Sequence, residues 1–287
     1  MKDEKTGQSP SGEPGLHTAG VAGSNPAAPI GSAGPGAGRA DLMKWIRTTT
    51  RIVLMLVGVL LCGGCKRAGT TEMIHGVRML RVLPQAVDPK APVVVALHGW
   101  SGDAEGYGGA WRRIGLELAA PEGFIPLARG FSWFDWPGGL SEEQLTERVN
   151  DAADRLWPAI AQIASGRKVI VIGSSQGAML AYALAARHPE GVAHAFPISG
   201  SAQRQIFLPG RVPAPVHAVH GTEDRVIPIE LDRSTVRAFK EHGGVAELDE
   251  LPGVGHAFTK DIRDHVLARL QSIIVAGTPP DAGSTQP

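Results

Sequence analysis

A serine in a glycine-flanked turn has the setting of a nucleophile. The turn spans Gly173 to Gly177 and reads Gly-Ser-Ser-Gln-Gly. It follows a run of β-favouring residues, Val169 to Ile172, and precedes an Ala- and Leu-rich stretch, Ala178 to His188. A strand, a sharp Gly-x-Ser-x-Gly turn and a helix, in that order, are typical of a nucleophile elbow, where a strained backbone aims the serine hydroxyl out of the sheet. The pattern predicts Ser175 as the nucleophile; the alternative is a plain glycine–serine loop.

A serine hydroxyl needs a base to take its proton, and the base needs an acid to orient it. After an elbow, the acid comes next in the chain and the histidine last, each on a loop beyond a strand. Asp224 follows a strand expected over Val216 to His220, and His256 lies on a glycine-rich loop after one expected over Ala246 to Leu251. These positions predict Asp224 as the acid and His256 as the base. The alternatives are Glu223 as the acid, Asp224 as a turn or capping residue, and His256 as a loop histidine without a role.

An oxyanion forms in such a reaction, and two backbone N–H groups must hold it. One comes from the residue after the nucleophile, Gln176, and the other from the loop after an earlier strand. The strand expected over Val93 to Leu97 leads into His98-Gly99-Trp100, which predicts the Trp100 N–H as the second donor. His98 is expected to be a structural residue beneath this loop. The alternative is a tight turn whose glycines are only structural.

Aromatic side chains gather in a loop over residues 131–136, which reads Phe-Ser-Trp-Phe-Asp-Trp. Because ligand pockets are mostly apolar, Trp100, Trp133 and Phe134 are predicted to line a pocket for an acyl or aromatic ester group. The alternative is that the loop packs onto the domain. That alternative is preferred for Trp136, since Pro-Gly-Gly follows it.

Other chemistries lack their signatures. The glycine-rich run that ends at Gly109 is not followed by Gly-Lys-Ser/Thr, so it is not a phosphate-binding loop. No His-x-x-x-His pattern or carboxylate cluster suggests a metal, and no cofactor is expected. The two cysteines, Cys62 and Cys65, both precede the globular region, which therefore has no disulfide and no thiolate nucleophile. The formal net charge is zero, which gives no electrostatic argument for a nucleic-acid partner.

Strand and helix patterns alternate from residue 76 to 276, which predicts a single α/β domain with a mostly parallel central sheet flanked by helices. The sequence of 287 residues contains no internal repeat that we recognise. Ser141 begins a capping-box pattern, and the helix after it is expected to kink at Pro158. Strands are expected over 77–83, 93–97, 116–121, 169–172, 194–198, 216–220 and 246–251, and helices around 111–114 and over 141–164, 178–188, 229–242 and 259–274.

The segments outside this domain predict export. Residues 1–42 are rich in Gly, Pro, Ala and Ser and are expected to be disordered. Residues 43–65 combine a basic start, a short apolar run and small residues, as a signal peptide does, and the small residues before Cys65 predict a lipidated cysteine. The alternative is a short membrane anchor. We interpret Met43 as the true start, residues 66–75 as a tether, and residues 277–287 as a flexible tail.

Taken together, these motifs resemble the phospholipase/carboxylesterase branch of the α/β hydrolases, which includes bacterial carboxylesterases and acyl-protein thioesterases. The resemblance rests on the Leu-His-Gly-Trp segment, the Ser-Trp-Phe-Asp loop, the Gly-x-Ser-Gln-Gly elbow, the His-Gly-Thr-Glu-Asp segment and the Gly-His pair, and spans roughly residues 77–274. It implies an α/β-hydrolase fold with Ser175, His256 and Asp224 as nucleophile, base and acid. The elbow departs from the family pattern at Ser174 and Ala178, where Phe and Gly are usual.

The sequence therefore predicts a serine hydrolase that cleaves carboxylic esters through an acyl-enzyme, exported and anchored to a bacterial membrane through a lipid or a signal anchor. Its expected partner is a small-molecule or lipid ester, and the oligomeric state stays open. Thioesterase, peptidase or polysaccharide-ester deacylase activity uses the same triad. A non-catalytic surface lipoprotein on the same fold is the alternative of another class.

Overall fold

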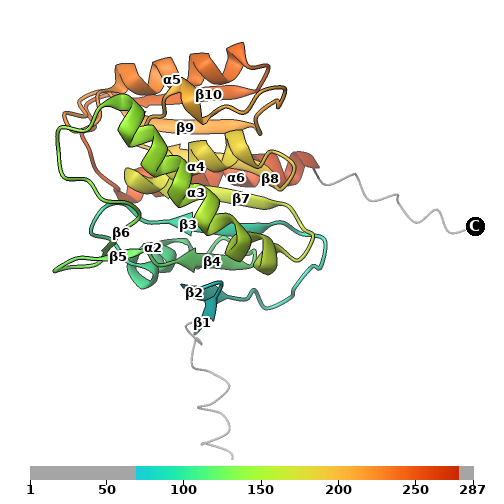
Figure 1. Cartoon of the computed structure of the whole chain (residues 1–287). Helices are drawn as coiled ribbons and strands as arrows, with labels where there is room; N and C mark the ends of the chain where they lie inside the picture. Colours follow the sequence, from blue (N-terminus) through green and yellow to red (C-terminus); the bar gives the residue numbers. More distant parts are fainter. Residues whose placement is uncertain (1–68, 278–287) are drawn as a thin grey trace, which may run out of the picture. The chain divides into compact units, whose positions relative to one another are not determined.

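A computed structural model describes residues 69–277 of the chain. These residues form a central eight-stranded sheet with helices on both faces (Figure 1). The strand order is β1-β2-β4-β3-β7-β8-β9-β10. Strand β2 runs antiparallel to both of its neighbours, and every other pairing in the sheet is parallel. The mostly parallel sheet predicted from the alternating pattern is confirmed.

The strands and helices have the following bounds along the chain. The strands are β1 (Thr70–Ile74), β2 (Val77–Val82), β3 (Val93–Leu97), β4 (Leu118–Pro121), β5 (Ile125–Pro126), β6 (Phe131–Ser132), β7 (Val169–Ser174), β8 (Val192–Ile198), β9 (Val216–Gly221) and β10 (Ala246–Leu251). The helices are α2 (Ala104–Trp111), α3 (Glu142–Ala164), α4 (Gln176–Arg187), α5 (Ile229–Glu241) and α6 (Lys260–Gly277), with a short 3₁₀ turn over Arg204–Ile206. Strands β5 and β6 pair with each other apart from the main sheet.

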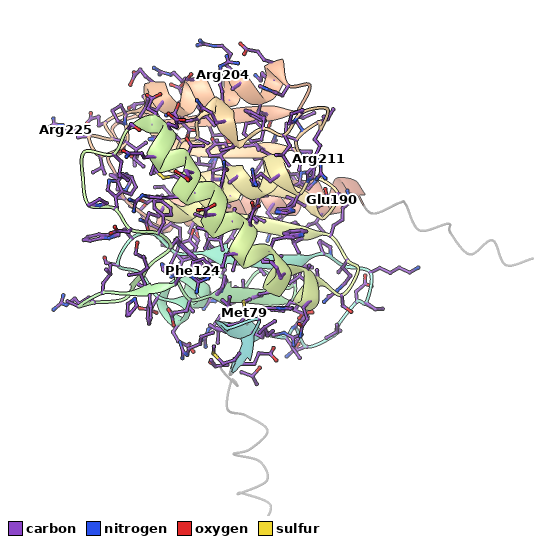
Figure 2. All side chains as sticks on the ribbon, viewed as in Figure 1. Met79, Phe124, Glu190, Arg204, Arg211 and Arg225 are labelled. Carbon is purple, nitrogen blue, oxygen red and sulfur yellow. The ribbon has the colours of Figure 1, made fainter. Side chains whose placement is uncertain are left out.

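Two apolar layers hold the sheet between the helices. Alternate residues of a strand point to opposite faces, so Val93 and Val95 of β3 pack with α3, α4 and α5, while Val94 and Ala96 pack with α2 and α6. Helix α4 is buried along its whole length except at its last residue, which is why its sequence is nearly all Ala, Leu and Met without a polar stripe. Helix α3 lies over the face of the sheet that α4 covers (Figure 1). The guanidinium group of Arg155, on α3, lies 4.0 Å from the centre of the Phe124 ring, and Phe124 is labelled in Figure 2.

Helix α3 begins as its sequence predicts. The Ser141 hydroxyl accepts from the Gln144 N–H at 3.2 Å, and the Gln144 side chain accepts from the Ser141 N–H at 3.0 Å. This reciprocal pair is the capping box. Helical structure continues through Pro158 to Ala164, and Ser165 then closes the helix in the left-handed conformation.

The structure corrects two expectations near the first strands. Residues 66–75 were expected to be a tether, but Thr70–Ile74 form edge strand β1, which pairs with β2. The helix expected around 111–114 lies earlier, over Ala104–Trp111, where Asp103 caps it by accepting from the Gly106 N–H at 2.6 Å. Three glycines in this helix weaken the helical pattern, because each costs about 1 kcal/mol relative to alanine.

The expectations for residues 1–42 and for the signal-like segment 43–65 with Cys65 lie outside the described residues. Of the tail expected over 277–287, Gly277 is the last residue of α6, and the rest also lies outside them. Within residues 69–277, no helix combines the length and the apolar character that a membrane span requires.

Candidate active site

Ser175 lies at the end of β7, in a backbone conformation that side chains rarely adopt. Its φ is +54° and its ψ is −116°, and it immediately precedes helix α4. The two flanking glycines are required by space: a Cβ on Gly173 would lie 2.0 Å from the Gly177 carbonyl oxygen, and one on Gly177 would lie 2.1 Å from the Leu97 carbonyl oxygen. The predicted elbow geometry is therefore present, and it points Ser175 toward the loops that follow β9 and β10.

Three predicted residues from three separate loops meet at this turn. His256 Nε2 lies 3.1 Å from Ser175 Oγ, and His256 Nδ1 lies 2.7 Å from Asp224 Oδ2. The His256 side chain keeps 22% of its surface exposed, whereas the Asp224 side chain is fully buried. The competing acid, Glu223, is exposed. This arrangement lets His256 take a proton from the serine on one ring nitrogen while Asp224 holds the other.

Asp224 is held firmly from its own loop. Its Oδ1 accepts from the backbone N–H groups of Val226 and Ile227, both at 2.9 Å. Burial alone would raise the pKa of this carboxyl group, but the hydrogen bonds from Ile227, His256 and Val226 lower it below its usual range. Asp224 therefore stays ionised at neutral pH and can support a positive charge on His256.

The loop after β3 lies directly against the elbow. A Cβ on Gly99 would lie 3.2 Å from the Ser174 carbonyl oxygen and 3.3 Å from Ser175 Cβ, so only glycine lets the loop approach this closely. Gln176 is the first residue of α4, where N–H groups have no partner within the helix and the helix dipole is positive. Across the described residues, neither the Trp100 N–H nor the Gln176 N–H donates to a protein acceptor. Both remain available to an oxyanion beside Ser175.

The side chain of Gln176 joins the elbow to the aromatic loop. It is fully buried, its Oε1 accepts from Ser132 Oγ at 3.0 Å and from the Trp133 N–H at 3.3 Å, and its Nε2 donates to the Phe134 carbonyl at 3.5 Å. This role of the Gln176 side chain was not predicted from the sequence. The Gln in the Gly-x-Ser-Gln-Gly elbow is the signal from which a buried amide could have been inferred.

Trp133 and Phe134 do not line the pocket, and their predicted role is wrong. Trp133 is 1% exposed, and its indole N–H donates to the His98 carbonyl at 2.7 Å. Phe134 is also buried, and its ring stacks under Trp136. Trp133 instead packs beneath the backbone of the loop after β3. The Phe124 ring meets the Trp133 ring edge-on, with 5.8 Å between the ring centroids. Residues with large apolar surfaces in a loop can pack inward as readily as they can line a pocket, and here they pack inward.

His98 supports the same loop. Its ring stacks on Trp133 with 4.7 Å between centroids, its Nδ1–H donates to the Gly99 carbonyl at 2.7 Å, and its Nε2 accepts from the Gly123 N–H at 3.0 Å. Burial lowers the pKa of His98, so both ring nitrogens keep these neutral roles. The structural role expected for His98 agrees with these contacts.

A cavity of about 430 Å³ opens at Ser175. Its lining combines the elbow and the base with exposed apolar side chains: Trp100 is 60% exposed, Trp136 40% and Val226 68%. Trp136 was assigned to loop packing and instead reaches this cavity, while Val226 was not considered. The residues that line it are Gly99, Trp100, Trp136, Ser175, Gln176, Val226, Ile227 and His256.

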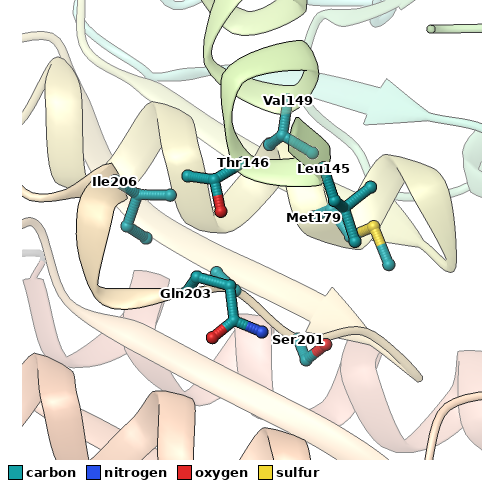
Figure 3. Close-up of a pocket in the computed structure, with 8 residues that line it drawn as sticks. Leu145, Thr146, Val149, Met179, Ser201, Gln203 and Ile206 are labelled. Carbon is teal, nitrogen blue, oxygen red and sulfur yellow. The ribbon is translucent and has the colours of Figure 1, made fainter. Parts of the chain in front are cut away.

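A second cavity, one turn along α4 from Ser175, is far smaller (Figure 3). It holds about 20 Å³, which accommodates one water molecule rather than an acyl group. Its lining residues are Leu145, Thr146, Val149, Met179, Ser201, Ala202, Gln203 and Ile206. A third cavity, of about 460 Å³, is lined by residues 207–212 and 241–242 and contains no residue of the elbow. The cavity at Ser175 is the candidate substrate site because Ser175 and His256 line it. Within the described chain, no group of three or more His, Cys, Asp or Glu side chains is placed to hold a metal ion.

One departure of the elbow has a packing partner. A Cβ on Gly200 would lie 2.4 Å from the Cβ of Ala178, so the extra methyl group at 178 needs the missing side chain at 200. The methyl group of Ala178 therefore packs against Gly200 in the interior and does not enter the substrate cavity.

The described residues have the α/β-hydrolase fold that solved esterase structures share. Residues 137–272, which include Ser175, Asp224 and His256, match the dienelactone hydrolase family. The chain is 26% identical over 140 residues to carboxylesterase SOBER1 of Arabidopsis thaliana, a match that covers 45% of this chain and 61% of that protein's length.

Solved structures show the same fold. The structure of esterase PE8 is 25% identical with a TM-score of 0.59, and the match covers 68% of this chain and 97% of that one. Acyl-protein thioesterase 2 of Zea mays is 20% identical with a TM-score of 0.54, and the match covers 68% of this chain and 98% of that one. These likenesses confirm the predicted α/β-hydrolase fold.

Proposed function

We propose that this protein is a serine hydrolase that cleaves carboxylic esters through an acyl-enzyme. The observation that carries the proposal is the unbroken hydrogen-bonded path from Ser175 through His256 to Asp224. The path starts at a strained elbow and opens into an apolar cavity, which is the arrangement that acyl transfer needs. The likeness to a carboxylesterase and to an esterase of known structure supports the same reaction class.

In this proposal Ser175 Oγ attacks the ester carbonyl while its proton passes to His256 Nε2. Asp224 stabilises the imidazolium that forms, and the N–H groups of Trp100 and Gln176 hold the oxyanion. His256 then gives its proton to the leaving alcohol, which departs as the acyl-enzyme forms. A water molecule, activated by the same histidine, attacks the acyl-enzyme and frees the acid and Ser175.

The volume and the lining of the cavity support a medium-sized, mainly apolar acyl group. Trp100, Trp136 and Val226 supply apolar surface at its mouth, and no charged side chain is among the residues that line it apart from the ionisable His256. A thioester is the second candidate substrate, because the likeness to an acyl-protein thioesterase points to the same chemistry with a thiol leaving group.

Fluorophosphonate labelling of the full chain tests this proposal. One probe molecule is expected on Ser175, located by peptide mass, and Ser174→Ala is expected to be labelled because it keeps the proposed nucleophile. Ser175→Ala is expected to lose labelling and to lower turnover of p-nitrophenyl esters by a thousandfold or more. A panel of oxygen esters and thioesters of increasing acyl length then identifies the preferred substrate. Equal turnover by the Ser175→Ala variant and the parent protein would refute the proposal.

A further inference from the structure

A path of buried polar side chains continues behind the proposed acid. His220, near the end of β9, lies between Asp224 on one side and Asp232 of α5 on the other. His220 Nε2 is 3.2 Å from Asp224 Oδ2, and His220 Nδ1 is 2.7 Å from Asp232 Oδ2. The hydroxyl of Tyr182, on α4, donates to the other oxygen of Asp232. The side chains of His220, Asp224 and Asp232 are all 0% exposed.

The partners of His220 determine where its protons lie. Its Nε2 is 2.8 Å from the carbonyl oxygen of Ile227, which only accepts hydrogen bonds, so this nitrogen carries a proton. The same N–H also faces Asp224 Oδ2. Its Nδ1 faces a carboxylate oxygen, and the other oxygen of that carboxylate is already an acceptor for Tyr182. Both ring nitrogens therefore face acceptors.

Charge balance favours the same protonation state. Two carboxylates without a cation would be costly in a site that excludes water, whereas an imidazolium between them offsets one of the two charges. Burial alone would lower the pKa of His220, but the hydrogen bond and charge of Asp232, with the Ile227 carbonyl and Asp224, raise it above its ordinary value. From the neighbouring strand, Glu250 is paired in register with His220, and Arg233 binds that carboxylate at 2.6 Å.

We propose that His220 is a positioning residue of the Ser175–His256–Asp224 site. It is an imidazolium held by Asp232, and it fixes Asp224 Oδ2 toward His256 and offsets part of the charge of Asp224. This inference rests on the proposed function. Without the cation, the full negative charge of Asp224 would act on His256 and stabilise its protonated form, which cannot accept the serine proton. His220 thus keeps His256 available as a base.

The pH dependence of fluorophosphonate labelling separates this role from a merely structural one. In Asp232→Asn, the asparagine amide can donate to Nδ1 of a neutral His220 and accept from Tyr182, so the variant removes the charges of Asp232 and His220 and keeps the shape of the site. The low-pH side of its labelling profile, called the acid limb here, is expected to move to higher pH. His220→Gln is expected to move that limb further, by about one pH unit, since it removes the cation and leaves Asp232 in place. His217→Gln, a buried histidine on the same strand but on the other face of the sheet, is the matched control, and its acid limb is expected to coincide with that of the parent protein.

Each outcome decides between the alternatives. Nitrogen-15 NMR of histidine-labelled parent protein is expected to show protons on both ring nitrogens of His220 at pH 7, and a single proton in Asp232→Asn. A singly protonated His220 in the parent, or an acid limb that does not move in Asp232→Asn, would overturn the inference, even if His220→Gln fails to fold. If the parent protein is not labelled at Ser175, the proposed function fails instead, and the NMR result still reports the charge of His220.

Discussion

Strand β9 carries two buried histidines, His217 and His220, which point to opposite faces of the sheet and have opposite surroundings. His220 lies between two carboxylates, which raise its pKa. His217 lies 3.1 Å from another histidine, His194 of β8, and burial lowers the pKa of both; that of His194 falls to about 4. The same residue type thus has a raised pKa at the carboxyl end of the sheet and a lowered pKa near the other end. Burial lowers the pKa of both β9 histidines, and the difference shows that Asp232 and Asp224 outweigh it at His220, whereas Glu247 and Asp249 do not outweigh it at His217.

The largest expected effect comes from replacing each β9 histidine with leucine. His220→Leu leaves Asp224 and Asp232 without a cation in a dry site and is expected to lower the free energy of unfolding by about 3–5 kcal/mol. His217→Leu removes a ring whose Nδ1 is buried without a hydrogen bond, although Glu247 lies 3.4 Å away, and is expected to change stability by less than about 1 kcal/mol. Urea unfolding at pH 7 measures both. Equal losses in the two variants would show that the two environments do not differ as described.

A smaller effect is expected from pH. The pKa of His194 in the folded chain, about 4, is below its unfolded value of 6.5, so protonation favours the unfolded chain. The stability that depends on neutral His194 is present above pH 6.5 and is lost as the pH falls toward 4. Because the ring is only partly buried, the loss is expected to be about 1–2 kcal/mol.

The difference in unfolding free energy between pH 7 and pH 4.5 tests this prediction. His194→Gln should lose less stability over that range than the parent chain does. His265→Gln, which removes a histidine that is 41% exposed, serves as the control and should follow the parent chain. A His194→Gln variant with the pH dependence of the parent would contradict the low pKa.

The smallest effect is expected from relieving backbone strain at Ser165, which has a positive φ as Ser175 does but lies outside the site. Ser165, which ends α3, has a φ of +50° and a ψ of +47°, a conformation that glycine adopts without strain. Ser165→Gly is therefore expected to stabilise the chain by about 0.5–1 kcal/mol and to leave labelling of Ser175 unchanged. Thermal unfolding measures the gain. A loss of stability would mean that the Ser165 side chain contributes more than its backbone strain costs.

The order of motifs along the chain was enough to predict which residues the structure brings together. Ser175, Asp224 and His256 each follow a strand that the sequence marks clearly, and parallel strands place the loops after them at one edge of the sheet. Local turn chemistry therefore determined these positions without knowledge of the rest of the fold. The catalytic roles of the three residues remain our proposal.

Contacts between distant segments could not be predicted in the same way. The Pro-Gly-Gly that follows Trp136 favoured packing for that residue, yet Trp136 reaches the cavity, and the indole of Trp133 binds the loop after β3. Strand β1 was missed because an edge strand that is largely exposed lacks the apolar alternation that marks a strand. The link between His220 and Asp232 joins a strand to a helix twelve positions later, and no spacing rule brings these two side chains to one another.

The anchoring of Gln176 has a practical consequence for protein engineering. One residue supplies a backbone N–H beside Ser175 and a side-chain amide that holds the Ser132–Phe134 loop, so the two tasks cannot be varied separately. Libraries that aim at new substrates should leave position 176 and its buried partners fixed. They should diversify Trp100, Trp136 and Val226, whose exposed side chains can change size without disturbing the packed interior.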